Sequence, residues 1–249
     1  THCISSAASD VYKRQLLNTE SIESKMDDLN GTKIGVIDSL LENSAWHSQD
    51  KKHPYLLAPV DLQAVKACGV TFAQSMLERV IEERAKGDPS AAQGIRNDIQ
   101  KVIGLDLESI IPGSSEAEQL KEVLIKKDMW SQYLEVGIGP DAEVFTKAQP
   151  MSVMGIGAQI GILEKSEWNN PEPEITLAVN ARGKILGATL GNDVNLRDIE
   201  GRSALLLGKA KDNNASAAIG PFIRLFDENF SLDDAVSYTH LTLPTICSV

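Results

Sequence analysis

Two glutamates, Glu172 and Glu174, flank a proline where the apolar run ITLAV begins. Residues i and i+2 of a β-strand point to the same face, so the two carboxylates would project side by side. Like charges this close raise each other's pKa unless a cation lies between them. The pattern therefore indicates either a cation site or two solvated charges ahead of an edge strand, where Pro173 is tolerated because proline has no N–H to donate.

A β-hairpin is expected to return a third carboxylate to this pair. Residues 175–179 alternate as a strand, and the NARG sequence at 180–183 predicts a turn. The returning strand, residues 184–190, is followed by Asp193. Three carboxylates without neighbouring Cys or His favour a hard cation, Mg²⁺, Mn²⁺ or Ca²⁺, over zinc. Solvated charges remain the alternative that spacing alone favours, because acidic residues cluster often in an acidic chain.

The elements around the hairpin predict an α+β fold. Residues 73–86 have apolar residues at helical spacing and end at the turn sequence GDPS, and residues 114–135 repeat the helical pattern. After Gly137 the helical periodicity ends, while glycine, proline and β-branched residues become frequent. Helices early in the chain and strands late in it are typical of the α+β class.

Both ends of the chain resemble translated sequencing adapter. Residues 5–15 (SSAASDVYKRQ) match one reading of a transposon-library adapter, and residues 235–246 (AVSYTHLTLPTI) match its reverse complement. We therefore expect residues 1–15 and 235–249 to be non-native and the gene to be cut at both ends. The native segment is therefore expected to be residues 16–234.

Composition excludes several classes of function. Between the two ends the cysteine is Cys68 and the histidines are His47 and His53, which excludes a disulfide framework or a Cys-rich zinc site. The chain's formal net charge of -11 disfavours nucleic acid and anionic membranes. No apolar stretch approaches the roughly 18 residues of a membrane-spanning helix. We expect a cytoplasmic protein whose partner is a small molecule, with no nucleic-acid or membrane partner.

Three motifs in order, NNPEPEI, GNDVNLRDIEG and LLLGKAKDNNASAAIGPFI, resemble the fumarylacetoacetate hydrolase superfamily, and within it the 2-keto-3-deoxy sugar acid dehydratase branch. The resemblance runs from about GVTF (69–72) to GPFI (220–223). It implies a mixed β-roll with helices on the N-terminal side, incomplete at its C-terminal end. It also implies a catalytic domain at 61–234, preceded by a partial N-terminal domain at 16–60, and a homodimer.

The resemblance assigns roles to individual residues. It implies one Mg²⁺ or Mn²⁺ bound by Glu172, Glu174 and Asp193. The stretch from Ala210 to Ser216 implies a catalytic lysine at Lys211, with Lys209 as the near alternative, and PDAEVFTKAQP implies an acid/base glutamate at Glu143. From residue type alone, a charged side chain of this kind is more often a solvated surface group. Further residues are expected to contact the substrate: Thr71, Phe72, Lys147 and Ser216.

One position separates the reactions within the superfamily. Hydrolytic members carry a His-x-x-Glu dyad that activates water, whereas this chain has Ser75 in place of the histidine and keeps Glu78. A serine does not take a proton from water at neutral pH, so the dyad is expected to be absent. His47 and His53 are expected to be ordinary surface residues.

The function expected from the resemblance is that of a metal-dependent hydro-lyase. It would dehydrate a 2-keto-3-deoxy sugar acid through a metal-stabilised enolate, with Lys211 and Glu143 transferring protons. One alternative is a C–C bond hydrolase of 2,4-diketo acids, of the fumarylacetoacetase or acylpyruvase type. A second is a catalytically silent metal-binding domain, in which a lysine such as Lys211 would have little use.

Overall fold

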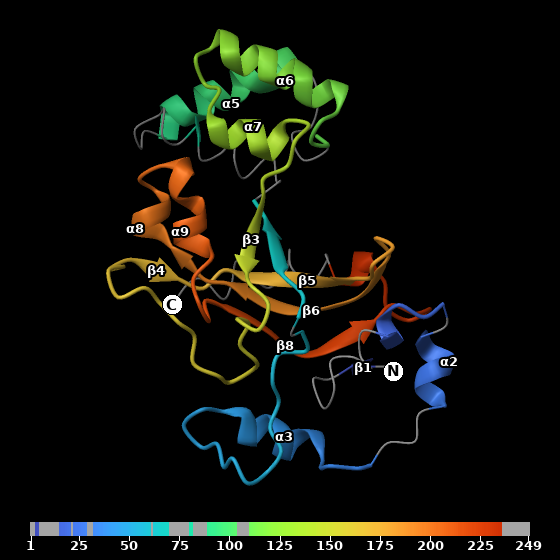
Figure 1. Cartoon of the computed structure of the whole chain (residues 1–249). Coiled ribbons are helices and arrows are strands. Elements are labelled where there is room, and N and C mark those ends of the chain that lie inside the picture. The colour runs from blue at the N-terminus through green and yellow to red at the C-terminus, as the bar shows by residue number, and fades with distance from the viewer. Residues whose placement is uncertain are drawn as a thin grey trace. The chain divides into compact units, whose positions relative to one another are not determined.

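The computed structural model describes residues 3–4, 15–20, 22–28, 32–60, 62–69, 80–81, 89–103 and 110–235. The chain divides into two compact units: Thr1–Lys66 with Thr146–Val249, and Ala67–Phe145. It passes between them through β2 (Val65–Cys68) and β3 (Val144–Ala148), which pair in a two-stranded sheet (Figure 1). The predicted domain boundaries stay predictions.

The main sheet belongs to the first unit and has the strand order β1-β8-β6-β5. Its strands are β1 (Cys3–Ile4), β5 (Pro173–Val179), β6 (Ile185–Asp193) and β8 (Ala217–Leu225). Neighbouring strands all pair antiparallel. The predicted hairpin is confirmed as β5 and β6, and β5 is an edge strand that begins at the proline, where no ladder N–H is needed.

The hairpin turn is held by its own residues. Asn180 Oδ1 accepts hydrogen bonds from the backbone N–H groups of Arg182 at 2.9 Å and Lys184 at 3.0 Å. Gly183 has φ 77°, in the left-handed region that glycine adopts without steric cost. This turn sets the register that places Pro173 opposite Asn192.

Short elements follow the hairpin and pack beside it. They are β4 (Asn169–Asn170), β7 (Asn195–Leu196), α8 (Arg197–Glu200), the 3₁₀ turn η2 (Ala204–Leu206) and α9 (Leu207–Lys211). β4 pairs antiparallel with β7, and Leu196, Ile199 and Ala210 form a small buried cluster. The segment after Asp193 is therefore held by strand pairing and by this buried cluster. Earlier in this unit lie α2 (Ile22–Asp27) and α3 (Ile37–Ser44).

The second unit is helical in its described part. Its helices are α5 (Pro89–Ile103), α6 (Ser115–Lys126) and α7 (Gln132–Ile138). The helical pattern predicted for residues 114–135 thus forms two helices, each capped by a serine: Ser114 accepts from the N–H of Ala117 at 3.1 Å, and Ser131 from that of Leu134 at 3.3 Å. Asp128, between the helices, has φ 56°.

The three helices share one hydrophobic core, which includes Ile99, Leu120, Leu124, Leu134 and Ile138. The helix predicted at 73–86 lies outside the described residues, apart from Val80 and Ile81, which are helical.

The mixture of helix and strand predicted from the sequence is confirmed, with helices at 89–138 and the main sheet mostly at 173–225. No helix in the described part of the chain is long and apolar enough to span a membrane.

Candidate functional site

Lys211 joins two of the predicted metal ligands. Its ammonium, at the end of α9, donates to Glu172 Oε2 at 2.5 Å and to Asp193 Oδ2 at 2.9 Å. Glu172 directly precedes β5 and Asp193 ends β6, and the N–H of Asp193 donates to the carbonyl of Glu172 at 2.9 Å. The side chains of Lys211 and Asp193 are 4% and 7% exposed, and that of Glu172 is 26% exposed. The hairpin therefore brings the two carboxylates together, as expected, and α9 places a cation between them.

The environment keeps Lys211 charged. Burial alone would lower the pKa of Lys211, but the charges of Asp193 and Glu172 and their hydrogen bonds outweigh burial, so that the pKa is raised. Lys211 is thus an ammonium in the metal-free protein and can donate a proton.

Glu174 is affected by the same charges. Surrounding protein atoms and then the negative charges of Asp193 and Glu172 raise the pKa of Glu174 to about 7, while Lys211 partly offsets them. The side chain of Glu174 keeps an exposed surface, which lets water screen the charges. All three predicted ligands therefore interact electrostatically at one end of the hairpin.

Lys147, on β3, is 2% exposed and holds the other side of Asp193. Its ammonium lies 3.2 Å from Asp193 Oδ1 and donates to the carbonyl of Val194 at 2.7 Å, to the carbonyl of Lys211, and to Ser216 Oγ at 3.3 Å. These contacts tie together the end of β6, the end of α9 and the loop that follows it. Burial lowers the pKa of Lys147, although Asp193 opposes the shift.

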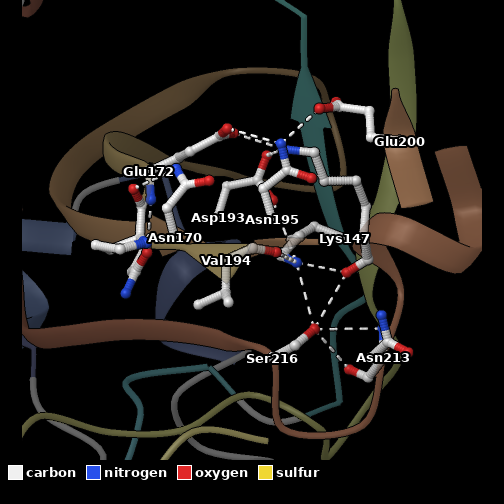
Figure 2. Close-up of polar contacts among 12 residues, drawn as sticks. Lys147, Asn170, Glu172, Asp193, Val194, Asn195, Glu200, Asn213 and Ser216 are labelled. Carbon is white, nitrogen blue, oxygen red and sulfur yellow. Dashed lines mark hydrogen bonds and ion pairs between the residues drawn. The ribbon is translucent and has the colours of Figure 1, made fainter. Parts of the chain in front are cut away.

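Asn195 and Glu200 belong to the same network, although neither was predicted from the sequence. Figure 2 shows the Asn195 side chain between the carboxyl groups of Glu172 and Glu200. Its Nδ2 donates to Glu172 Oε1 at 2.9 Å and to Glu200 Oε2 at 2.6 Å. Arg197 adds a longer ion pair to Glu172 Oε1, at 3.8 Å. The signal that could have pointed to Asn195 is its place two residues after Asp193, in the segment that follows the hairpin.

The donor chemistry of Glu172, Glu174 and Asp193 fits a hard divalent cation, because all their ligand atoms are carboxylate oxygens. Beyond burial, the negative charges of Asp193 and Glu172 raise the pKa of Glu174, and a bound cation would offset them. Nevertheless, no group of three or more His, Cys, Asp or Glu side chains in the described residues is arranged to hold a metal ion. Lys211 lies between two of the carboxylates, so a cation there would have to displace its ammonium.

Two further predicted site residues, Ser216 and Glu143, belong to different units of the chain. Ser216 is buried, and its hydroxyl lies 3.1 Å and 2.9 Å from the carbonyl oxygens of Lys211 and Asn213. Glu143 belongs to the second unit, where its carbonyl accepts from the N–H of Gly69 at 2.9 Å. Its catalytic role therefore stays a prediction.

Four residues named from the sequence, Thr71, Phe72, Ser75 and Glu78, lie outside the described residues. His47 and His53 are exposed, as expected of ordinary surface residues. His53 pairs with Asp50 at 3.0 Å.

No protein-family model matches the chain. Among curated proteins, it is 39% identical over 107 residues to a Haloferax volcanii protein named "Probable 2-keto-3-deoxyxylonate dehydratase"; the match covers 43% of this chain and 36% of that protein. It is 40% identical over 94 residues to the 2-dehydro-3-deoxy-D-arabinonate dehydratase of Saccharolobus solfataricus, covering 36% of this chain and 32% of that protein. The matches thus span about a third of the length of these relatives.

The fold of the chain also matches the folds of solved structures. The structure matches 2-keto-3-deoxy-D-arabinonate dehydratase complexed with magnesium and 2,5-dioxopentanoate with a TM-score of 0.52 at 24% identity, covering 82% of this chain and 54% of that one. The apo form of that dehydratase matches with a TM-score of 0.53 over the same shares of both chains. The chain therefore shares the fold of these structures and is similar in sequence to 2-keto-3-deoxy sugar acid dehydratases.

Proposed function

We propose that this protein dehydrates a 2-keto-3-deoxy sugar acid with Mg²⁺ or Mn²⁺ as its cofactor. The observation that carries the proposal is the buried ammonium of Lys211 between Glu172 and Asp193. This arrangement lies in a chain that is about 40% identical to two named dehydratases over part of their length.

The predicted ligands of the cation are Glu172, Glu174 and Asp193. When bound, Mg²⁺ would act as a Lewis acid on the carbonyl of a 2-oxo acid and so acidify the neighbouring C3 protons. In this proposal the Lys211 ammonium donates a proton beside these carboxylates, and Glu143 is the predicted second acid/base residue.

The reaction removes one proton from C3 and the hydroxyl group from C4, and together they leave as water. The unsaturated 2-oxo acid then tautomerises, which for a pentonate yields a dioxo acid. A dioxo acid, 2,5-dioxopentanoate, is the compound named with the solved dehydratase, and this agreement supports the proposed reaction class.

The proposal is tested by the mass of the product. The purified protein is incubated with Mg²⁺ and a 2-keto-3-deoxy pentonate, and in a separate reaction with a 2,4-diketo acid. We expect loss of one water from the first substrate and no change in the second. Glu174→Ala should abolish the reaction, and Lys211→Met should lower kcat by about 10²-fold to 10⁴-fold, the usual contribution of a general acid or base. Lys209→Met, a change at an exposed lysine of the same helix, is the matched control.

Two other results would each replace the proposal. Cleavage of the diketo acid into two smaller acids would show a C–C hydrolase whose water is activated without a histidine at position 75. Binding of Mg²⁺ with turnover of neither acid would point to a catalytically silent metal-binding domain.

A further inference from the structure

Asn195 is completely buried, and both N–H groups of its amide are directed at carboxylates. Its backbone is fixed by the pairing of β7 with β4, where Asn195 lies opposite Asn170. The next residue, Leu196, is in a buried cluster, which anchors the segment further. The amide is therefore presented to Glu172 from a rigid support.

The contacts of Asn195 complete a pattern around Lys211. Glu172 accepts a hydrogen bond from Lys211 on Oε2 and another from Asn195 on Oε1. Asp193 accepts a hydrogen bond from Lys211 on Oδ2, and its Oδ1 forms an ion pair with Lys147. Each carboxylate therefore has one oxygen on the shared ammonium, while the other oxygen accepts from Asn195 in Glu172 and forms an ion pair with Lys147 in Asp193.

Stability alone does not explain an asparagine at this position. Asn195 Oδ1 is buried and has no hydrogen-bond partner among the described residues. An unsatisfied buried acceptor costs about 1–3 kcal/mol, which is set against the two hydrogen bonds that Asn195 donates to Glu172 and Glu200. The amide is thus better explained by what its two donors do for the carboxylates.

We propose that Asn195 is a positioning residue, which fixes the orientation of the Glu172 carboxylate and thereby the affinity of the centre for Mg²⁺. This inference rests on the proposed function, because it takes Glu172 as a ligand of the cation. Asn195 acts through Glu172 and touches neither the substrate nor the cation. Groups that orient metal ligands in this way typically change metal affinity by about 10-fold to 100-fold when they are removed.

The test measures Mg²⁺ binding by calorimetry without substrate, and then kcat and KM at saturating Mg²⁺. Asn195→Ala removes both donors, and Asn195→Leu removes them while nearly keeping the side-chain volume. Asn170→Ala is the matched control, because Asn170 is paired with Asn195 in the ladder but its Nδ2 donates to the carbonyl of Pro171. Circular dichroism establishes that each variant is folded at the temperature of the measurement.

We expect both Asn195 variants to raise the Kd for Mg²⁺ by about 10-fold or more, with KM unchanged and Asn170→Ala like the wild type. Folded Asn195 variants with the wild-type Kd would overturn the inference, and so would a loss of affinity in Asn195→Ala alone, which would indicate a cavity effect. A wild type that binds Mg²⁺ but dehydrates no sugar acid would overturn the proposed function and leave the role of Asn195 standing. A wild type that binds no Mg²⁺ would overturn both.

Discussion

Lys147 and Lys211 contact the same carboxylate, Asp193, yet their pKa values shift in opposite directions. Lys211 has two carboxylates within hydrogen-bonding distance, and their charges outweigh its burial. Lys147 has one carboxylate oxygen at 3.2 Å, and its other contacts are neutral carbonyl and hydroxyl oxygens. Lys211 also repels it. Lys147 therefore depends on Asp193 to offset the effect of burial on its pKa, and Lys147 is in turn the ion-pair partner of Asp193 Oδ1.

This dependence predicts a large loss of stability in Lys147→Met. Removal of one partner of a buried ion pair costs about 3–5 kcal/mol when the other charge is left uncompensated, and because Asp193 keeps Lys211 at 2.9 Å the loss should lie toward about 3 kcal/mol. Chemical denaturation monitored by circular dichroism would measure the change in the free energy of unfolding. Lys209→Met, at an exposed position, should leave that free energy nearly unchanged. A loss for Lys147→Met as small as that of the control would contradict the buried pairing.

The second prediction at this scale concerns pH. Because the pKa of Glu174 in the metal-free protein is raised to about 7, protons compete with Mg²⁺ for its carboxylate. We expect Mg²⁺ affinity to increase from about pH 6 to about pH 8, with proton release on binding near the lower value. Calorimetry in two buffers of different ionisation enthalpy would count the protons. An affinity that is flat over this range would contradict the raised pKa, and Glu174→Gln should remove the proton release.

The raised pKa of Glu174 also makes the stability of the fold depend on pH. The metal-free fold favours the protonated carboxyl of Glu174, so this contribution to stability is present at low pH. It is lost as the pH rises from the ordinary value of 4.5 through about 7.

At this scale the sequence predicted only part of the centre. The return of Asp193 to Glu172 followed from strand alternation and a recognisable turn, which are local features. The contact of Asn195 with Glu172 could not be predicted, because it depends on the pairing of β4 with β7, two strands of two residues each. Such short strands leave no periodic signal.

Among the elements, the β5–β6 hairpin carries two of the three predicted ligands, and its turn depends on the conformation of Gly183. An added Cβ there would meet no other atoms within 4 Å, so the cost of Gly183→Ala comes from the backbone. We expect this variant to lose about 1–2 kcal/mol in the free energy of unfolding. Gly208 in α9 also has open space around it, and Gly208→Ala should be neutral or stabilising by up to about 1 kcal/mol. Thermal unfolding of both variants would check this, and equal effects would contradict it.

Helix α5 was not predicted from the sequence. The GDPS sequence was interpreted as the end of a helix, but Pro89 is also the first residue of α5. Proline is favoured at the first helical position because its missing N–H would be unpaired there anyway. The spacing of Ile95 and Ile99, four residues apart, is a signal that could have indicated this helix.

At the scale of the whole molecule, each unit has its own hydrophobic core. Periodicity in the sequence predicted helices, but it did not predict that the chain divides into two units. The boundaries between the units fall within β2 and β3, which are far apart in the sequence. Leu124, with no exposed surface, lies in the core of the second unit.

The separate cores predict separate responses to mutation. Leu124→Ala should cost about 2–5 kcal/mol, because it leaves a cavity among α5, α6 and α7. Hydrogen exchange measured by mass spectrometry should become faster in these helices, while protection of β5, β6 and β8 is retained. Equal acceleration in both units would show that they unfold as one.

The paired strands β2 and β3 also determine what evolution can alter. Residues 67–145 leave the first unit in one strand and re-enter it in the neighbouring one, so the two ends of this segment lie side by side. Such a segment can lengthen, shorten or be exchanged without interrupting the hairpin outside it. It includes Thr71, Phe72 and Glu143, three of the residues predicted to act on the substrate. We expect divergence among related proteins to concentrate in this segment, so that substrate preference changes while the carboxylate and lysine centre is inherited intact.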